Sequence, residues 1–251
     1  MRVAIPSYQR SDSINKKSLK FLYEQGFEAK DIDLFVANEE EESIYRKVVD
    51  SEVNIVVGHK GLIEIRNFIF HYYTEGSKLL ILDDDIEGLK SLNYEQENLS
   101  DCYNLKTICK KGFELCEEKD QKLWGLYTCA NPRFMKKTDE FTSDYKFIIG
   151  NLFGCVNCKE MNSLSVLDID DVERSIRSYL IYGGSIRLNH FAVKTKFLKN
   201  TGGAQQENRI DRIHSSIDIL LEKYPKLLYT KSKKSGIQKS IILRDMRKTK
   251  V

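Results

Sequence analysis

Residues 78–85 read KLLILDDD, a run of four apolar residues that leads directly into three consecutive aspartates. A short apolar run of this kind is typical of a strand that is buried on both faces of a parallel sheet. Carboxylates at close range repel one another, and each disfavours ionisation of its neighbours unless a cation is present. The stretch therefore predicts a buried strand that ends in a site for Mg²⁺ or Mn²⁺. The alternative is an acidic turn or a helix cap.

Strand and helix patterns alternate on the N-terminal side of this stretch. We expect strands at residues 2–6, 33–37 and 53–57, and helices at residues 14–26, 39–49 and 62–73. Alternation with short connections predicts an α/β fold with a mainly parallel, doubly wound sheet and right-handed crossovers. Ligands collect at the carboxyl ends of the strands in such sheets, and the aspartates follow such an end.

The pattern is less regular after the aspartates and predicts an α+β extension of the sheet. We expect helices at residues 102–119, 170–182 and 205–224, strands at 123–130, 146–156, 185–193 and 237–243, and a polar loop at 131–144. Cys102, Cys109 and Cys116 recur every seven residues, which indicates one buried helical face. Cys155 and Cys158 form a lone CxxC without the two further ligands of a zinc site, so a structural role is favoured.

The composition excludes several classes of protein. At 251 residues, with 41% hydrophobic and 31% charged residues, the chain is long enough for one domain with a sizeable core. No segment approaches the roughly 20 apolar residues that a membrane span requires. The N-terminus lacks the apolar stretch of a secretory signal, and the cysteines are too sparse for a disulfide framework. We expect a cytoplasmic protein with reduced thiols and no membrane contact.

The charge is distributed unevenly. Residues 222–251 contain ten lysines and arginines against two acids, a surplus of +8, which leaves the first 221 residues at −5 within the overall +3. Clustered cations favour a polyanionic partner because they release condensed counterions from its phosphates. A solvated basic tail that only aids solubility explains the same pattern equally well.

Three motifs in this order resemble those of GT-A fold glycosyltransferases: VAIPSYQR at 3–10, GLIEIRN at 61–67 and LLILDDD at 79–85. The resemblance implies a GT-A-like, Rossmann-like fold that binds a nucleotide sugar. It implies that Asp83 faces the ribose and metal, and that Asp85 is the principal ligand of Mn²⁺ or Mg²⁺. The residues implied at the nucleotide sugar are Pro6, Ser7, Tyr8, Arg10, Gly61, Arg66, Asn67, Asp83 and Asp84.

A second acidic motif, DIDDVERSIR at 168–177, is followed by YGG at 182–184. It is similar to the motif that opens the acceptor-side helix of such enzymes, where a carboxylate takes the proton from the acceptor hydroxyl. A hydroxyl is a poor nucleophile, and a positioned general base accelerates its attack by about 10²–10⁴-fold. Asp171 is the preferred base, with Asp170 as the alternative. An acidic first turn that stabilises its own helix is the competing interpretation.

Late residues offer weaker candidates. Many GT-A enzymes supply a late histidine as a metal ligand, and His190 is a candidate here, whereas His214 shares an apolar helical face and is expected to be packed. Lys196 and the turn that contains Gly202 and Gly203 are candidates for binding the diphosphate. A flexible loop explains these last residues as well.

The combined motifs look like the small modified-base glycosyltransferases, including the TET/JBP-associated family, which glycosylate hydroxymethylpyrimidines in phage and protist DNA. That likeness implies a UDP-sugar donor such as UDP-glucose, a DNA acceptor and inversion of configuration. It divides one catalytic domain into a nucleotide-sugar half (1–92), an acceptor half (93–221) and a basic segment (222–251). The alternatives are transfer to a glycan, protein or small molecule, nucleotidyl transfer, and a DNA-binding module without activity.

Overall fold

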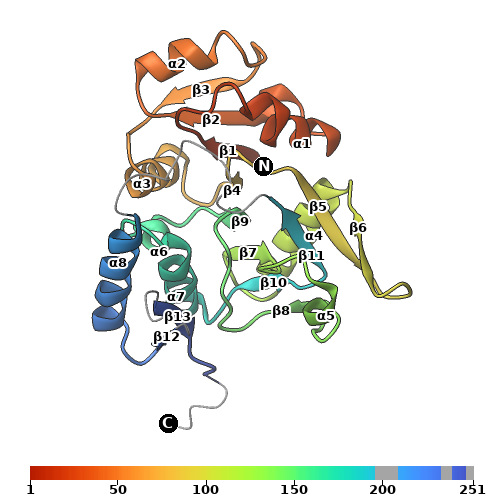
Figure 1. Ribbon diagram of the computed structural model, residues 1–251, viewed down its shortest axis with the longest axis vertical. Coiled ribbons are helices and arrows are strands. Elements are labelled where there is room, and N and C mark those ends of the chain that lie inside the picture. Colours follow the sequence, from red (N-terminus) through yellow and green to blue (C-terminus); the bar gives the residue numbers. More distant parts are fainter. Residues whose placement is uncertain (196–208, 233–238, 247–251) are drawn as a thin grey trace.

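The computed structural model describes residues 1–195, 209–232 and 239–246. Within these residues the main sheet has eight strands in the order β3-β2-β1-β4-β9-β7-β10-β8 (Figure 1). Its strands are β1 (Arg2–Pro6), β2 (Ile32–Val36), β3 (Asn54–Val57), β4 (Lys78–Leu82), β7 (Leu123–Leu126), β8 (Phe141–Thr142), β9 (Leu152–Val156) and β10 (Ile186–Leu188). The pairs β3–β2, β2–β1, β1–β4 and β7–β10 are parallel, whereas β9 is antiparallel to β4 and β7, and β8 is antiparallel to β10. The sheet is mixed but mostly parallel, which agrees with the predicted fold class.

Helices cover both faces of this sheet, as a doubly wound fold requires. They are α1 (Ser18–Glu24), α2 (Glu39–Tyr45), α3 (Leu62–Tyr72), α4 (Leu105–Glu118), α5 (Pro132–Met135), α6 (Lys159–Asn162), α7 (Asp170–Tyr182) and α8 (Arg209–Lys223). Two short 3₁₀ turns, η1 (Ile14–Lys16) and η2 (Ala29–Asp31), complete the described helical segments. In the described chain no helix is both long enough and apolar enough to cross a membrane.

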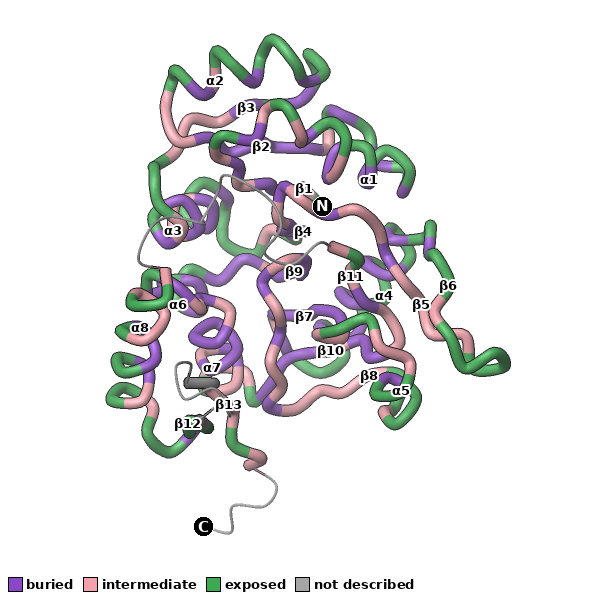
Figure 2. The backbone as a smooth tube through the Cα atoms, in the orientation of Figure 1, coloured by how far each residue is buried: buried purple, intermediate pink, exposed green. Residues whose placement is uncertain are grey.

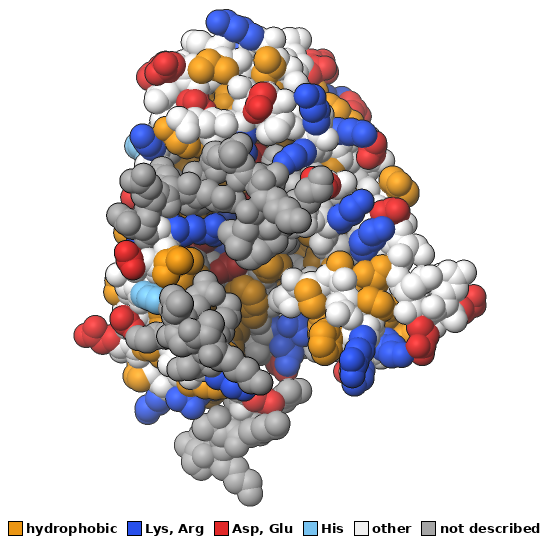
Figure 3. All heavy atoms as spheres, in the orientation of Figure 1, with side chains coloured by type: hydrophobic (Ala, Val, Ile, Leu, Met, Phe, Trp, Pro, Cys, Tyr) orange, Lys and Arg blue, Asp and Glu red, His pale blue; other side chains and the backbone are white. Residues whose placement is uncertain are grey.

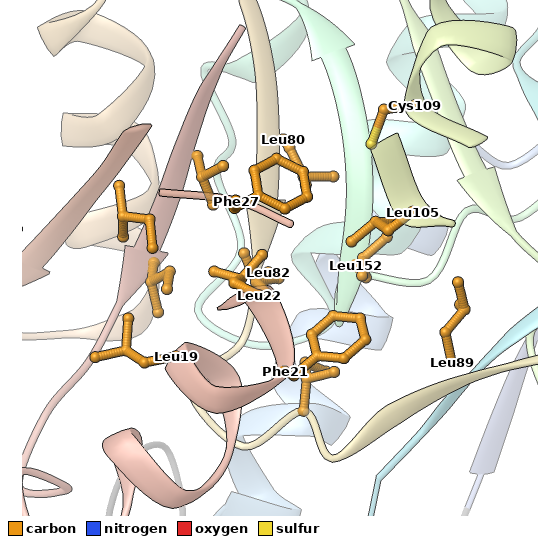
Figure 4. Close-up of a cluster of buried hydrophobic side chains, with 14 of the residues drawn as sticks. Leu19, Phe21, Leu22, Phe27, Leu80, Leu82, Leu89, Leu105, Cys109 and Leu152 are labelled. Carbon is orange, nitrogen blue, oxygen red and sulfur yellow. The ribbon is translucent and has the colours of Figure 1, made fainter. Parts of the chain in front are cut away.

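The apolar run of β4 explains why this strand is central. Side chains of a strand alternate between the faces of the sheet. Leu80 and Leu82 join one core cluster, and Leu79 and Ile81 join the other, all with at most 2% exposure. Figure 4 shows the first cluster, in which Leu80 and Leu82 lie among side chains from α1 and α4. A strand with two buried faces therefore carries the aspartates to the carboxyl edge of the sheet.

In Figure 2 the residues coloured as buried follow β1, β2, β4, β7 and β9, whereas the outer faces of α2 and α8 are exposed. All six cysteines are free thiols. Cys102, Cys109 and Cys116 all pack in the first core cluster, as the heptad spacing predicts. Cys155 and Cys158 are buried in the second cluster, where the Tyr182 hydroxyl donates to Cys158 Sγ at 3.1 Å.

Several boundaries in the second half differ from prediction. The strand expected at 185–193 is two strands, because β10 belongs to the main sheet and β11 (Phe191–Lys194) to a second sheet of order β11-β5-β6. In this sheet β5 is Gly88–Asn93 and β6 is Asn98–Asp101. The strand expected at 146–156 begins only at Leu152, and the expected loop at 131–144 contains α5 and β8.

A third apolar cluster joins α7 to the C-terminal elements. The strands β12 (Leu228–Ser232) and β13 (Lys239–Leu243) form an antiparallel pair. Val172 and Ile176 of α7 pack with Leu220 of α8 and Leu228 of β12. As a result α8 and the β12–β13 pair lie beside α7, at the end of the molecule opposite β2 and β3 (Figure 1).

Side chains of both charges are interspersed on the face shown in Figure 3. Much of the basic C-terminal segment, including Lys233, Lys234 and Arg247, lies outside the described residues. The expectation of a basic patch there stays a prediction.

Candidate active site

The carboxyl ends of β1 and β4 are neighbours at the edge of the sheet, because these strands pair in parallel. The chain leaves β1 toward β2 on one side, whereas β4 is followed by segments on the other side of the sheet. Such a reversal of direction is where α/β folds bind ligands. The loop after Pro6 and the aspartates after Leu82 therefore meet at a crevice.

Ser18 of α1 holds the turn that contains the aspartates. Its buried hydroxyl donates to the carbonyl oxygen of Asp83 at 2.7 Å and accepts from the backbone N–H of Ile86 at 2.9 Å. The N–H of Asp83 also donates to the carbonyl of Asn151 at 2.9 Å. These bonds orient the three carboxylates before any ligand is present.

Asp84 connects the aspartates to the loop after β1. Its carboxylate accepts a hydrogen bond from Ser7 Oγ at 2.6 Å and forms a buried ion pair with Arg10. Ser7 Oγ also lies 2.7 Å from the hydroxyl of Tyr45, which accepts from the N–H of Arg10 at 3.0 Å. The Asp84 carboxylate therefore bonds other protein groups and connects the loop after β1 to the aspartate turn.

Arg66 of α3 bridges the aspartates and α7. Its guanidinium is 6% exposed and lies 3.0 Å from Asp83 Oδ1 and 3.4 Å from Asp170 Oδ2. The same group donates to the carbonyl of Gly150 at 3.4 Å. One buried cation thus neutralises charge on both sides of the crevice.

The adjacent carboxylates Asp170 and Asp171 have different surroundings. Burial alone raises the pKa of Asp170, but the guanidinium groups of Arg66 and Arg174 outweigh burial and hold this pKa below its usual range. Burial and the neighbouring charge of Asp170 raise the pKa of Asp171 to about 6. Asp171 accepts from the N–H of Gly150 at 3.1 Å and from its own helix at Val172 N–H at 2.9 Å. Asp171 is therefore the more basic of the two, as a general base near neutral pH must be.

Asp83 and Asp85 fit a divalent cation. Their side chains are 37% and 20% exposed and line the cavity, although Asp83 pairs with Arg66 and Asp85 lies 3.2 Å from Arg10 Nη1; the Asp84 side chain is only 7% exposed. Burial and the charges of Asp84 and Asp85 raise the pKa of Asp83 to about 7, although Arg66 opposes this shift. Mg²⁺ and Mn²⁺ suit one or two protein carboxylates completed by phosphates and water. No group of three or more acidic, histidine or cysteine side chains among the described residues would hold the ion alone.

These groups line one cavity of about 1200 Å³. On one side are the β1 loop, the start of α3 and the aspartates, and on the other are residues 167–172, part of α8 and residues 241–245 of the C-terminal hairpin. The predicted site residues that line it are Pro6, Ser7, Tyr8, Arg10, Gly61, Arg66, Asp83, Asp84, Asp85, Asp170 and Asp171.

Asn67 does not join them. Both atoms of its carboxamide bond the backbone of Leu164, at 3.0 Å each, so this residue fastens α3 to the segment before α7. Asn67 follows Arg66 in the sequence but does not line the cavity, so its contact with the nucleotide stays a prediction that this geometry does not support. His190 bonds Thr138 and Tyr94, at the end of β11 away from the aspartates. Lys196, Gly202 and Gly203 lie outside the described residues.

Sequence reasoning missed Ser18, Tyr45, Gly150 and Glu41. Glu41 accepts from the N–H of Gln9 at 2.9 Å, which holds Gln9 in a left-handed conformation with φ of 55°. All four act through contacts between residues distant in sequence, which no local motif reveals.

No protein-family model matches the sequence, and no curated protein matches it significantly. Solved structures do match. The S. aureus TarS fragment 1–349 in complex with UDP-GlcNAc is 15% identical, with a TM-score of 0.53 over 88% of this chain and 67% of that one. The Pyrobaculum calidifontis mannosyltransferase PcManGT in complex with GDP-Man and Mn²⁺ is 14% identical, with a TM-score of 0.51 over 74% of this chain and 53% of that one. Another structure of S. aureus TarS is 14% identical with a TM-score of 0.51, and the match spans 90% of this chain but only 40% of that one. The chain therefore has the fold of GT-A glycosyltransferases.

Proposed function

We propose that this protein is a metal-dependent glycosyltransferase that moves glucose from UDP-glucose to the hydroxyl of a 5-hydroxymethylpyrimidine base in DNA. One observation carries the proposal: a single cavity contains the β1 loop, the aspartate run and Asp171. The fold shared with TarS, solved with UDP-GlcNAc, and with PcManGT, solved with GDP-Man and Mn²⁺, supports a nucleotide-sugar donor.

In the proposed reaction, the loop from Pro6 to Arg10 and the start of α3 bind the nucleotide. Asp83 and Asp85 hold Mn²⁺ or Mg²⁺, which when bound offsets charge on the leaving diphosphate. Asp171 accepts the proton of the acceptor hydroxyl while the oxygen of that hydroxyl forms a bond to the anomeric carbon. The bond from that carbon to the diphosphate breaks, UDP leaves, and the configuration inverts.

The DNA acceptor is the finer part of the proposal. Its support is the +8 surplus of residues 222–251, together with the motif resemblance described above. A base hydroxyl inside a duplex must be turned out of the stack, at a cost of a few kcal/mol. Transfer to a glycan, protein or small molecule is the alternative, and its activity should depend much less on salt.

The test is to incubate the protein with Mn²⁺, a panel of nucleotide sugars and DNA that contains 5-hydroxymethylcytosine or 5-hydroxymethyluracil. We expect mass analysis of the nucleosides to show one added hexose with UDP-glucose, and the anomeric centre of the product to be inverted. Asp85→Ala should abolish transfer. Full activity of this variant would remove the metal site from the proposal, and retention would remove Asp171 as base.

A further inference from the structure

Two arginines of α8 face one buried carboxylate. Arg209 and Arg212 are three residues apart, so they lie on the same side of the helix. Arg212 Nε is 2.9 Å from Asp168 Oδ2, and Arg209 Nε is 3.8 Å from Asp168 Oδ1. The Asp168 side chain is 4% exposed, and Ser216 Oγ lies 3.2 Å from its backbone nitrogen. All three charged residues line the cavity of the candidate active site.

In this cluster one carboxylate, that of Asp168, faces two guanidinium groups. Arg209 Nε is buried and has no hydrogen-bond partner among the described residues. A buried charged donor without an acceptor is costly, so an acceptor oxygen supplied by a ligand to Arg209 Nε would be stabilising. The two arginines are only 34% and 27% exposed, which places their charge in the cavity wall and not in bulk water.

A ligand that supplies such oxygens to two guanidinium groups is a phosphate. The planar guanidinium matches phosphate with paired N–H donors, and these charge-assisted bonds are among the strongest hydrogen bonds in proteins. We propose that Arg209 and Arg212, held in place by Asp168, form a phosphate-binding subsite that is separate from the metal aspartates.

The subsite lies on the same side of the cavity as the proposed base. Asp168 precedes Asp171 by three residues, a span of at most roughly 11 Å. Arg66 pairs with Asp170, the neighbour of Asp171, and with Asp83, where the donor side begins. This placement favours a phosphate that belongs to the acceptor, an assignment that rests on the proposed function. The other source is the diphosphate of the donor.

Binding of inorganic phosphate to the metal-free protein tests the subsite itself, without any transfer reaction. We expect the Nε–H resonances of Arg209 and Arg212 to shift to saturation in a phosphate titration followed by NMR. Arg212→Gln should weaken the binding about tenfold or more. Arg177→Gln removes the same charge from α7, where Arg177 bonds the carbonyl of Glu160 outside the cavity, and should leave phosphate binding unchanged. Resonances that do not move, or equal effects of the two variants, would overturn the subsite.

Two further titrations identify the source of the phosphate. If the phosphate belongs to the acceptor, Arg212→Gln weakens the binding of a short single-stranded oligonucleotide and leaves UDP–Mn²⁺ binding unchanged. The magnitude of the slope of log affinity against log salt concentration for the oligonucleotide then falls by about 1. If the phosphate belongs to the donor, UDP–Mn²⁺ binding weakens instead. If the Arg212→Gln protein is folded and binds both the oligonucleotide and UDP–Mn²⁺ as the wild type does, the subsite does not bind a substrate phosphate. Because these measurements need no sugar transfer, they remain informative even if the proposed transferase activity is absent.

Discussion

At the residue scale, Asp170 and Asp171 share a helix turn but not an environment. Arg66 and Arg174 keep Asp170 ionised, and its charge in turn raises the pKa of Asp171 to about 6. In the proposed reaction Asp171 takes the proton of the acceptor hydroxyl, which it can do only in its ionised form. At saturating metal, kcat/KM should therefore be level above this pKa and fall about tenfold per pH unit below it. A pH profile of kcat/KM measures this fall at low pH, the acidic limb of the profile.

Two variants separate the roles in that profile. Asp170→Asn removes the negative neighbour of Asp171, so the acidic limb should move to lower pH. Asp171→Asn should reduce kcat by about 10²–10⁴-fold and abolish the limb. An unchanged limb in Asp171→Asn would show that another group titrates.

Ser7 gives a stability prediction at the same scale. Its buried hydroxyl joins Asp84 to Tyr45, and Ser7→Ala leaves both groups short of a partner. We expect the free energy of unfolding to fall by about 1–3 kcal/mol in a urea titration. Ser43→Ala removes an exposed hydroxyl that bonds Glu39 on α2, and should change stability by at most about 0.5 kcal/mol. Equal effects would mean that Ser7 is not a structural link.

At the scale of elements, Trp124 of β7 packs between a helix and a strand because both present glycine. A Cβ added to Gly112 of α4 would lie 2.5 Å from the Trp124 ring, and one added to Gly154 of β9 would lie 2.1 Å from its nitrogen. Gly154→Ala should therefore destabilise the fold by about 1–3 kcal/mol through overpacking. Gly88→Ala in β5 is the control, since its nearest side-chain contact would be 3.8 Å away. Thermal or urea unfolding of the two variants measures the difference.

The elements that the sequence predicts well are those with a local cause. The strands before the aspartates agree with β1 to β4 to within about one residue, because a continuous apolar run marks burial on two faces. The segment 185–193 was predicted as one strand since its apolar residues continue past Asn189. Asn189 ends β10 instead, with its side chain bonded to Asp139 and Arg187. The contact with Asp139 joins residues 50 positions apart along the chain, so the periodicity of the sequence does not reveal this break.

In the candidate site, too, features with a local cause could be predicted, whereas those that depend on long-range contacts could not. The aspartate run was predicted as a cation site from its charge and its place after a strand, and Asp171 as the base from the motif resemblance; these residues and most of the predicted nucleotide residues line the cavity. The hydrogen bonds that orient them come from Ser18 and Tyr45, and the division of labour between Asp84 and its neighbours follows from burial. Asn67 does not line the cavity with Arg66, because adjacency in the sequence does not place two side chains on one helical face.

At the scale of the whole molecule, the cavity predicts linkage between ligand and stability. UDP with Mn²⁺ at about 100 times its Kd should stabilise the folded protein by about 2.7 kcal/mol, which is about 5–10 °C in Tm for a chain of this size. Asp85→Ala should remove the part of the shift that depends on Mn²⁺. A thermal scan with UDP, Mn²⁺, both and neither checks this. An absent shift in the wild type would favour a binding module that does not use nucleotide sugars.

The bridge that Arg66 makes between Asp83 and Asp170 joins elements made early and late in synthesis. The walls of the cavity come from residues 6 to 245, so the pocket is assembled only when nearly all of these residues have left the ribosome. A nascent chain that has folded β1 to β4 carries the aspartates, but neither Asp171 nor the wall from α8 and the hairpin. In the proposed reaction, activation of water by Asp171, and with it hydrolysis of the donor, is therefore absent until the acceptor side of the cavity exists.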